Sequence, residues 1–410
     1  MKLLNKLVNS GIITKRKKFL TVFTVFILLL SNIYSQSFFE YRGYLQNTQT
    51  LSFNSILSDI LTPPGQAINS GLVLNRFDLF FYPADAWTIN AGVRNLVEYG
   101  QNVSNPIFQV LGTTYADFIT KDEGYFDLTW KWSDGTSYVF YTNIDRLNIF
   151  YSGNNLEFQL GRQRINWGVN LVWTPNDIFN SASYLNFDYA EKPGSDAGRI
   201  QYYFGFATSL EFVYKIDYNN DITSALMFKF NEWDYDFQLF AGTMLKDYVL
   251  GGGWSGNISS ANFSGEVTYF KDKENFADTT GQLVSSLGVT YTFPENIYLH
   301  GEFLYNSTGK LGKAGGAGNY FQNPYSAKNL SPAKYSLFGD ISYQITPLIR
   351  IDLSSIFNPS DKSFYIGPFT DISLSQSVDL LLAGQFFFGD DGTEWGDYGQ
   401  FYYLRIKWNF

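Results

Sequence analysis

The feature that most constrains the fold is an alternation of apolar and polar residues with a period of two, which recurs along most of the chain. In residues 402–410 every second side chain is apolar, and Arg405, Lys407 and Asn409 stand between them. Residues 223–230, 263–269, 299–305, 337–343 and 349–353 show the same alternation. Because successive side chains of a strand point to opposite faces, each segment predicts a strand with one apolar and one polar face.

These strands are expected to close into a barrel. Each alternating segment spans about 9–11 residues and ends in aromatic residues, which is typical of strands that cross a membrane; aromatic residues make up 19% of the chain. In hydrocarbon every backbone N–H and C=O must be paired within the protein, which a closed barrel achieves. A soluble β-sandwich fits less well, because the polar face carries charges throughout. The predicted fold is all-β, a transmembrane antiparallel up-and-down β-barrel of about 18 strands (roughly 16–20).

The first 35 residues have the pattern of a secretory signal peptide. Lys15–Lys18 is a basic segment, Phe19–Leu30 is an uninterrupted apolar run, and Ser35 offers a small residue before the expected cleavage. The run is shorter than the roughly 20 residues of a membrane-spanning helix. We therefore interpret 1–35 as a signal peptide and 36–410 as one outer-membrane barrel. The chain contains no Cys, so disulfides and thiolate metal sites are excluded.

The charge of the chain excludes one class of partner. The signal segment contains six of the 29 Lys and Arg residues and no acidic residue, so the remainder carries 23 basic and 38 acidic side chains. Nucleic-acid binding needs clustered basic residues, and a formal charge of −15 for 36–410 argues against it. A surface that favours cations or handles sugars is compatible with this charge.

The lengths of the connections predict the sidedness of the barrel. Periplasmic turns are short and extracellular loops are longer, and counting back from Phe410 places Ile165–Ala197 on the extracellular side, directed outward or folded into the mouth. Gln46–Asn69 is predicted to be another surface loop. Gly100–Glu123 is either one long loop or contains a further strand at Ile107–Ala116.

The candidate functional residues lie in and beside the segment Ile165–Ala197. Arg162 and Arg164 are expected to pair with carboxylates, because the planar guanidinium binds them bidentately. The carboxylates available are Asp177, Asp188, Glu191 and Asp196. The aromatic residues Trp167, Trp173, Tyr184 and Tyr189 either stack on a sugar ring or form a small core of the loop itself. Neither alternative requires catalysis.

Part of this segment resembles a known family. Gly161–Gly168 (GRQRINWG), followed by Trp173–Asn180 (WTPNDIFN), resembles the GRQ…WG segment of Gram-negative outer-membrane porin-like barrels akin to the alginate-export type, with a Bacteroidota character. The match lies within 154–206; elsewhere only the barrel pattern agrees. The resemblance implies a substrate pore in which Arg162, Arg164 and Arg199 line the lumen. Alginate-type pores are expected to be strongly basic inside, whereas 36–410 is acidic.

Three further features have weaker functional interpretations. His300, the only histidine, is expected to point into the lumen beside Glu302; a hydrolase would have to use it. Asp390–Glu394 offers oxygen ligands but lacks the spacing of a calcium loop, so we expect a solvated hairpin tip and no metal. Gly251–Gly253 is expected to allow close packing or a bend in the wall.

The sequence thus predicts a non-enzymatic outer-membrane porin or channel for passive diffusion of small hydrophilic solutes, saccharides among them, with no cofactor. Expected partners are outer-membrane lipid and the barrel assembly machinery, which recognises a last strand ending in an aromatic residue such as Phe410. A homo-oligomer is left open. One alternative is a structural or assembly barrel that serves surface polysaccharide or adhesion. The other is an outer-membrane hydrolase that uses His300.

Overall fold

The structure is a computed structural model that describes residues 38–53, 67–105, 107–110, 112–187, 189–315 and 325–410. The chain divides into Met1–Glu40, of which only 38–40 are described, and the compact unit Tyr41–Phe410. The predicted signal peptide, 1–35, lies outside the described residues. No helix in the described ranges is long and apolar enough to cross a membrane.

Nearly all regular structure in the described residues is β-strand. The strands are β1 (Phe39–Phe53), β2 (Ile68–Ala84), β3 (Trp87–Gly100), β4 (Thr129–Asp134), β5 (Tyr138–Gly153), β6 (Leu156–Gln163), β7 (Ser195–Tyr203), β8 (Ser209–Ile216), β9 (Ile222–Glu232), β10 (Tyr235–Met244), β11 (Asp247–Ile258), β12 (Ala261–Asp272), β13 (Gln282–Thr292), β14 (Ile297–Asn306), β15 (Tyr335–Thr346), β16 (Ile349–Phe357), β17 (Phe364–Ser375), β18 (Val378–Phe388) and β19 (Gln400–Asn409). Two short helices, α4 (Ile107–Val110) and α5 (Tyr115–Ile119), lie between β3 and β4.

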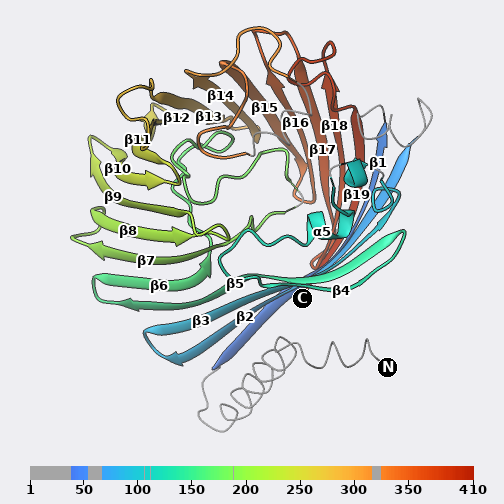
Figure 1. Ribbon diagram of the computed structural model, residues 1–410, viewed down its shortest axis with the longest axis horizontal. Coiled ribbons are helices and arrows are strands. Elements are labelled where there is room, and N and C mark those ends of the chain that lie inside the picture. The colour runs from blue at the N-terminus through green and yellow to red at the C-terminus, as the bar shows by residue number, and fades with distance from the viewer. Residues whose placement is uncertain (1–37, 54–66, 106, 111, 188, 316–324) are drawn as a thin grey trace. The chain divides into compact units, whose positions relative to one another are not determined.

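The sheet closes on itself. Neighbouring strands pair antiparallel in sequence order, and β1 pairs with β19 from Tyr44 opposite Asn409 to Phe53 opposite Gln400 (Figure 1). The exception is the short strand β4, because β5 pairs with β3 along one edge and with both β4 and β6 along the other. Without β4, the described residues form a closed circuit of 18 strands, which confirms the predicted fold and strand number.

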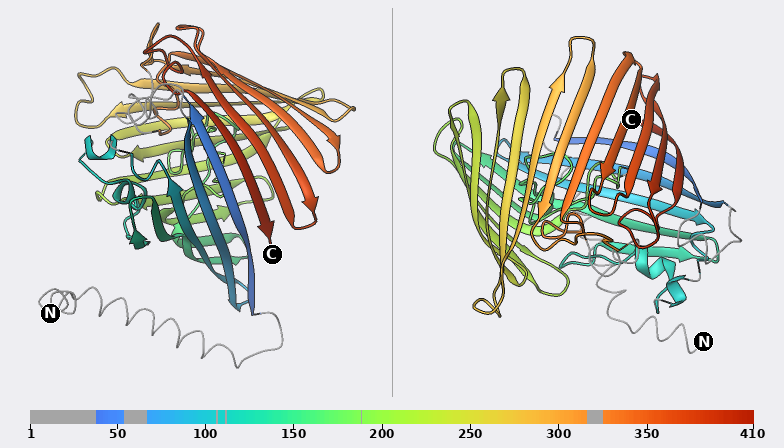
Figure 2. Two further views of the ribbon diagram at one scale, coloured as in Figure 1. Left: turned by 90° about the vertical axis from the view of Figure 1, so that its right-hand side faces the viewer. Right: turned by 90° about the horizontal axis from the view of Figure 1, so that it is seen from above.

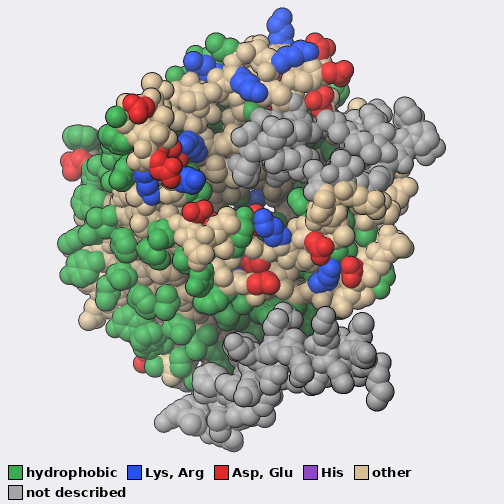
Figure 3. Space-filling model, viewed as in Figure 1, with side chains coloured by type: hydrophobic (Ala, Val, Ile, Leu, Met, Phe, Trp, Pro, Cys, Tyr) green, Lys and Arg blue, Asp and Glu red, His purple; other side chains and the backbone are tan. Residues whose placement is uncertain are grey.

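The two faces of the wall have opposite character. On β19 the outward side chains of Tyr402, Leu404, Ile406 and Trp408 are 43–50% exposed, and the residues between them are half-buried inside the barrel. Figure 2 shows the strands as one continuous wall, and Figure 3 shows hydrophobic side chains gathered over the outer face of β7–β10. An outer face of this kind suits a lipid environment, and a polar inner face suits water.

One prediction about the N-terminal third needs correction, and one open alternative is decided. Gln46–Phe53 is part of β1 and not of a surface loop: Gln46, Thr48 and Ser52 are buried on the inner face while Leu51 is 41% exposed on the outer face. Six of the eight residues in this stretch are polar, and they concealed the alternation. The strand considered at Ile107–Ala116 is absent from the described residues, where α4 and the start of α5 occupy that position.

Candidate functional site: a loop fixed inside the barrel

The segment between β6 and β7, residues 164–194, folds into the barrel and not away from it. Figure 1 shows it in green, crossing the interior of the ring of strands. Its described residues have no regular secondary structure, yet Ile165, Trp167, Trp173 and Asn176 are all at most 3% exposed. Buried backbone N–H groups need partners, so an irregular segment in this position depends on acceptors that the barrel wall supplies. We call this segment the interior loop.

Glu266, which points inward from β12, fixes the first turn of the interior loop. Its carboxylate accepts backbone N–H groups from Val169 at 2.5 Å, Asn170 at 2.6 Å and Asn176 at 2.8 Å. The side chain is 1% exposed. A carboxylate that accepts three N–H groups forms charge-assisted hydrogen bonds, which are stronger than those between neutral groups.

Glu302, on β14, repeats this arrangement two strands away. It accepts the backbone N–H groups of Leu171 and Val172 at 2.9 Å each, and that of Trp173 at 3.0 Å. Between the two carboxylates, Ser286 on β13 accepts a hydrogen bond from the Asn170 side chain and donates one to the Trp173 carbonyl. The inner face of β12–β14 thus holds six N–H groups of the interior loop by two carboxylates.

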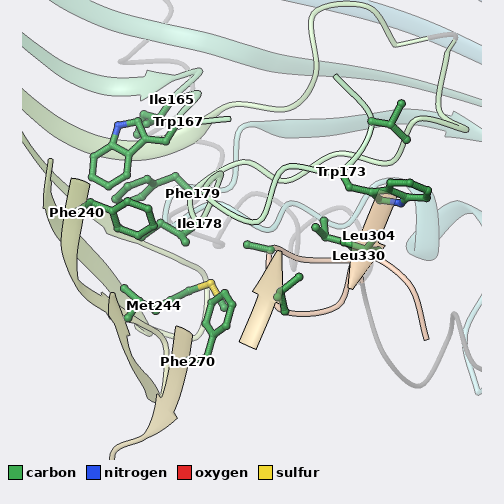
Figure 4. Packing of buried hydrophobic residues seen from close by; sticks show 14 of the residues in the cluster. Ile165, Trp167, Trp173, Ile178, Phe179, Phe240, Met244, Phe270, Leu304 and Leu330 are labelled. Atoms are coloured by element: carbon green, nitrogen blue, oxygen red, sulfur yellow. The ribbon is translucent and has the colours of Figure 1, made fainter. Parts of the chain in front are cut away.

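The interior loop also has an apolar core against the wall. The ring of Trp167 meets Phe179 edge-on at 4.8 Å and Phe240 of β10 at 5.4 Å, and its Nε1 donates to Glu211 at 3.0 Å. Figure 4 shows Trp167, Phe179 and Phe240 together, with Trp173 packed separately near Leu304 and Leu330. Both tryptophans are therefore part of the folded loop, with 1% and 3% exposure.

A buried ion-pair cluster holds both ends of the interior loop. Arg162, at the end of β6, binds both carboxylate oxygens of Asp196 on β7 at 2.8 and 2.9 Å. Its Nη1 binds Asp122 at 2.7 Å, and all three side chains are at most 6% exposed. Asp122 lies in the connection before β4, so this cluster joins three segments. The sequence did not identify Asp122 as a partner.

The interior loop carries further charged residues, some of them partly exposed. Arg164 reaches Asp177 at 3.3 Å and keeps 25% of its side chain exposed, whereas Asp177 is 2% exposed. Burial raises the pKa of Asp177 to about 6, and the Arg164 charge acts in the opposite direction. Glu191 accepts a hydrogen bond from the Tyr44 hydroxyl at 3.1 Å, and Arg146 donates to the carbonyls of Glu191 and Lys192.

The remaining predicted site residues are placed as follows. Arg199 lies on β7, pairs with Glu211 at 3.1 Å and is 26% exposed. Asp188 lies outside the described residues. His300 Nε2 is 2.9 Å from Glu302 Oε1, so the histidine supports a carboxylate that holds the interior loop. Among the described residues, no group of His, Cys, Asp and Glu side chains is arranged to hold a metal ion.

Two chambers lie on either side of the interior loop, toward β13–β19. The loop-side chamber, about 520 Å³, opens near the long connections and is lined by Tyr325, Leu330, Phe387, Trp395, Tyr398 and Phe401 among others. The turn-side chamber, about 830 Å³, extends toward the short turns after β13 and β15, and its wall includes Asp340, Arg350, Asp352, Asp371 and Arg405. In the space-filling view a hollow is visible near the centre of the barrel (Figure 3).

The two chambers share four residues of their walls. Val172, Ser183 and Tyr184 of the interior loop and Gln385 of β18 line both of them. The chambers therefore meet at these four residues, which we call the waist. Gln385 is held in place because its Nε2 donates to the Leu185 carbonyl at 3.0 Å and its Oε1 accepts from Tyr403 at 2.9 Å.

The architecture matches that of solved bacterial channels. Acinetobacter baumannii OccAB3 has a TM-score of 0.54 at 10% identity, covering 90% of this chain and 99% of that chain. A BenF-like porin from Pseudomonas fluorescens has a TM-score of 0.53 at 10% identity, covering 91% of this chain and 98% of that chain. The chain has the porin fold. Pseudomonas aeruginosa OccK11 also has it, with a TM-score of 0.52 at 8% identity and coverage of 92% of this chain and 99% of that chain.

By sequence, no family model and no curated protein matches the chain. At about a tenth identity, the similarity to porins concerns the fold. The resemblance of Gly161–Asn180 to alginate-export barrels stays a prediction.

Proposed function

We propose that this protein is an outer-membrane channel through which small hydrophilic solutes diffuse passively, and that the interior loop forms its constriction. The observation that carries the proposal is the pair of chambers on either side of the interior loop, which share the waist residues in their walls. Diffusion down a gradient requires a wetted, charged constriction and no chemical step. The porin fold and the apolar outer face support a place in the outer membrane, with lipid around the wall.

The orientation follows from the connections. The short turns lie at the same end of the barrel as the C-terminus, and bacterial barrels place such turns in the periplasm. The loop-side chamber then faces the cell exterior. Phe410 pairs with Gly43 of β1 through two backbone hydrogen bonds of 2.9 Å, so the last residue takes part in closing the barrel. Recognition of this strand by the assembly machinery is part of the proposal.

We propose that the partly exposed charged side chains in and beside the interior loop select the solutes that pass. Arg164, Glu191 and Arg199 are 23–26% exposed. They are not among the residues that line the two chambers, and we propose that these predicted site residues act on permeating solutes from beside the path. Arg162, Trp167, Trp173, Asp177 and Asp196 are buried and are proposed to act by fixing the shape of the interior loop. Both acidic and basic side chains line the turn-side chamber, which suits polar solutes. We include saccharides among the proposed solutes.

The decisive experiment is reconstitution of the purified barrel in planar bilayers, where we expect discrete conductance steps. Tyr184→Ala removes a ring from the waist and is expected to raise the single-channel conductance. Tyr343→Ala is the matched control, because Tyr343 is 40% exposed on the outer face of β15. A correctly folded barrel that never conducts, or a waist variant that conducts like the control, contradicts the proposal.

One observation favours a second candidate, a structural or assembly barrel with a sealed interior. The interior loop fills the half of the barrel next to β8–β14 and is fixed by many buried contacts. A sealed barrel predicts no conductance in the wild type and none after Tyr184→Ala. The same bilayer experiment therefore separates the two functions.

A further inference from the structure

The loop-side chamber differs from the turn-side chamber in the chemistry of its wall. Among the described residues that line it, the only Asp, Glu, Lys, Arg or His side chain is that of Glu394, which is 4% exposed behind Ser331. The turn-side chamber, in contrast, is lined by Lys192, Arg350 and Arg405 as well as three aspartates. A solute that pauses on the loop side therefore meets hardly any fixed charge.

Aromatic rings make up one side of the loop-side chamber in a row of two stacked groups, which meet edge to face where Phe387 contacts Phe401 at 6.1 Å and 89°. Phe387 of β18 lies parallel to Tyr398 at 5.0 Å and 28°, and to Trp395 at 5.8 Å and 28°. Phe401 and Tyr403 of β19 stack on each other at 6.3 Å and 14°. The rings come from two neighbouring strands and from the connection between them, so the barrel wall holds the row rigidly.

The row continues past the waist. Tyr403, which lines the loop-side chamber, meets Phe187 edge-on at 4.9 Å, and Phe187 lines the turn-side chamber. Polar groups accompany the rings: the Gln385 amide binds the Tyr403 hydroxyl, and Ser183 and Asn186 stand on the interior loop opposite. A surface of aromatic rings with hydrogen-bonding groups at its edge is an arrangement that binding sites use to orient a solute.

We propose that the loop-side chamber is a binding subsite for uncharged saccharides, which stack the C–H face of a sugar ring on the aromatic row and turn their hydroxyls toward the amides and hydroxyls beside it. The inference rests on the proposed channel function and adds a solute class and a place to it. A purely aromatic solute would leave the polar edge unused, and a charged sugar would meet no acidic or basic side chain other than the buried Glu394 among the described residues of the chamber wall.

The test combines two readouts on the full-length barrel. Maltotriose added on the loop side of a planar bilayer is expected to produce transient current blockades, and calorimetric titration of the detergent-solubilised barrel measures the same binding without conduction. The double variant Trp395→Ala, Tyr398→Ala is expected to raise Kd at least about tenfold, since two ring contacts are lost. The double variant Trp395→Phe, Tyr398→Phe keeps both rings and is expected to stay within about threefold of the wild type.

Phe388→Ala is the matched control, because Phe388 neighbours Phe387 on β18 but is 37% exposed on the outer face. A conducting wild-type barrel that neither binds nor is blocked by maltotriose overturns the subsite and leaves the channel intact. Equal binding by the alanine and phenylalanine variants also overturns it. Binding of benzyl alcohol, or of a trimer of charged uronate sugars, in preference to maltotriose overturns the assignment to uncharged saccharides. A barrel that binds maltotriose without ever conducting supports the subsite and overturns the channel.

Discussion

Glu302 Oε2 accepts a hydrogen bond at 3.0 Å from the backbone N–H of Trp173, a residue 129 positions earlier in the chain. The contact joins the wall of the barrel to the interior loop, and Glu266 repeats it two strands away. Both carboxylates replace the partners that regular secondary structure would have given to the N–H groups. The shape of the constriction is thus encoded on β12 and β14 as much as in the loop itself.

Glu302→Ala is therefore expected to release the middle of the interior loop without preventing assembly of the barrel. Each of three N–H groups loses its acceptor, at a cost of about 1–3 kcal/mol for each group left buried and unpaired. Open-channel current noise should increase and limited proteolysis within 169–176 should accelerate. Glu295→Gln, in the exposed turn before β14, is the control. Wild-type noise together with wild-type protection from protease would show that Glu302 does not fix the loop.

Arg162→Ala is expected to destabilise the folded barrel. The substitution leaves Asp122 and Asp196 buried without their counter-charge, and breaking a buried ion pair in this way costs about 3–5 kcal/mol. The heat-modifiable gel shift of the folded barrel should move to lower temperature. The companion variant Arg162→Ala, Asp196→Asn removes one orphaned charge and should recover part of the loss. No recovery in the double variant would argue that the pairing contributes nothing.

Arg164→Ala tests charge selection, because Arg164 is partly exposed and has a looser contact with Asp177 than Arg162 has with its partners. Loss of this positive charge beside the path should shift the reversal potential in a salt gradient toward cation preference. Arg164→Lys keeps the charge and should preserve the wild-type value. If both variants give the wild-type reversal potential, Arg164 does not face the permeating ions.

The barrel could be predicted from the sequence because lipid imposes one rule on every strand: alternate side chains must be apolar. The rule failed at Gln46–Phe53, where β1 presents several polar residues and too few apolar ones to be recognised. The candidate site was less predictable. Arg162 and Asp196 lie on paired strands and could be matched. Asp122 reaches Arg162, and Glu266 and Glu302 reach the interior loop, only through the folding of distant segments together, which no local pattern reveals.

Gly253 illustrates the same limit and leads to another prediction. A Cβ at this position on β11 would lie 2.8 Å from Asn176 Nδ2 and 3.1 Å from a methyl group of Val169. Gly253→Val should therefore displace the turn at 169–176 and change the conductance while the barrel still forms. Gly339→Ala is the control, since a Cβ there meets no atom within 4 Å. Equal conductance of the two variants would show that the interior loop tolerates the added side chain.

Glu394 gives the barrel a predictable dependence on pH. Burial raises the pKa of this carboxyl, in the connection between β18 and β19, from 4.5 to about 7. Between these values the folded state binds more protons than the unfolded state, so stability falls as pH rises from about 4.5 through about 7 and is highest below that window. Glu394→Gln removes the titration and should reduce the change in unfolding free energy across this pH range by up to about 3 kcal/mol.

Urea midpoints of the folded barrel in detergent at pH 4 and pH 8 measure the change. Glu274→Gln, in an exposed loop, is the control. Two results would show that the buried carboxyl does not titrate in this range. In the first, the stability of the wild type does not change with pH. In the second, it rises with pH by as much as the stability of Glu394→Gln does.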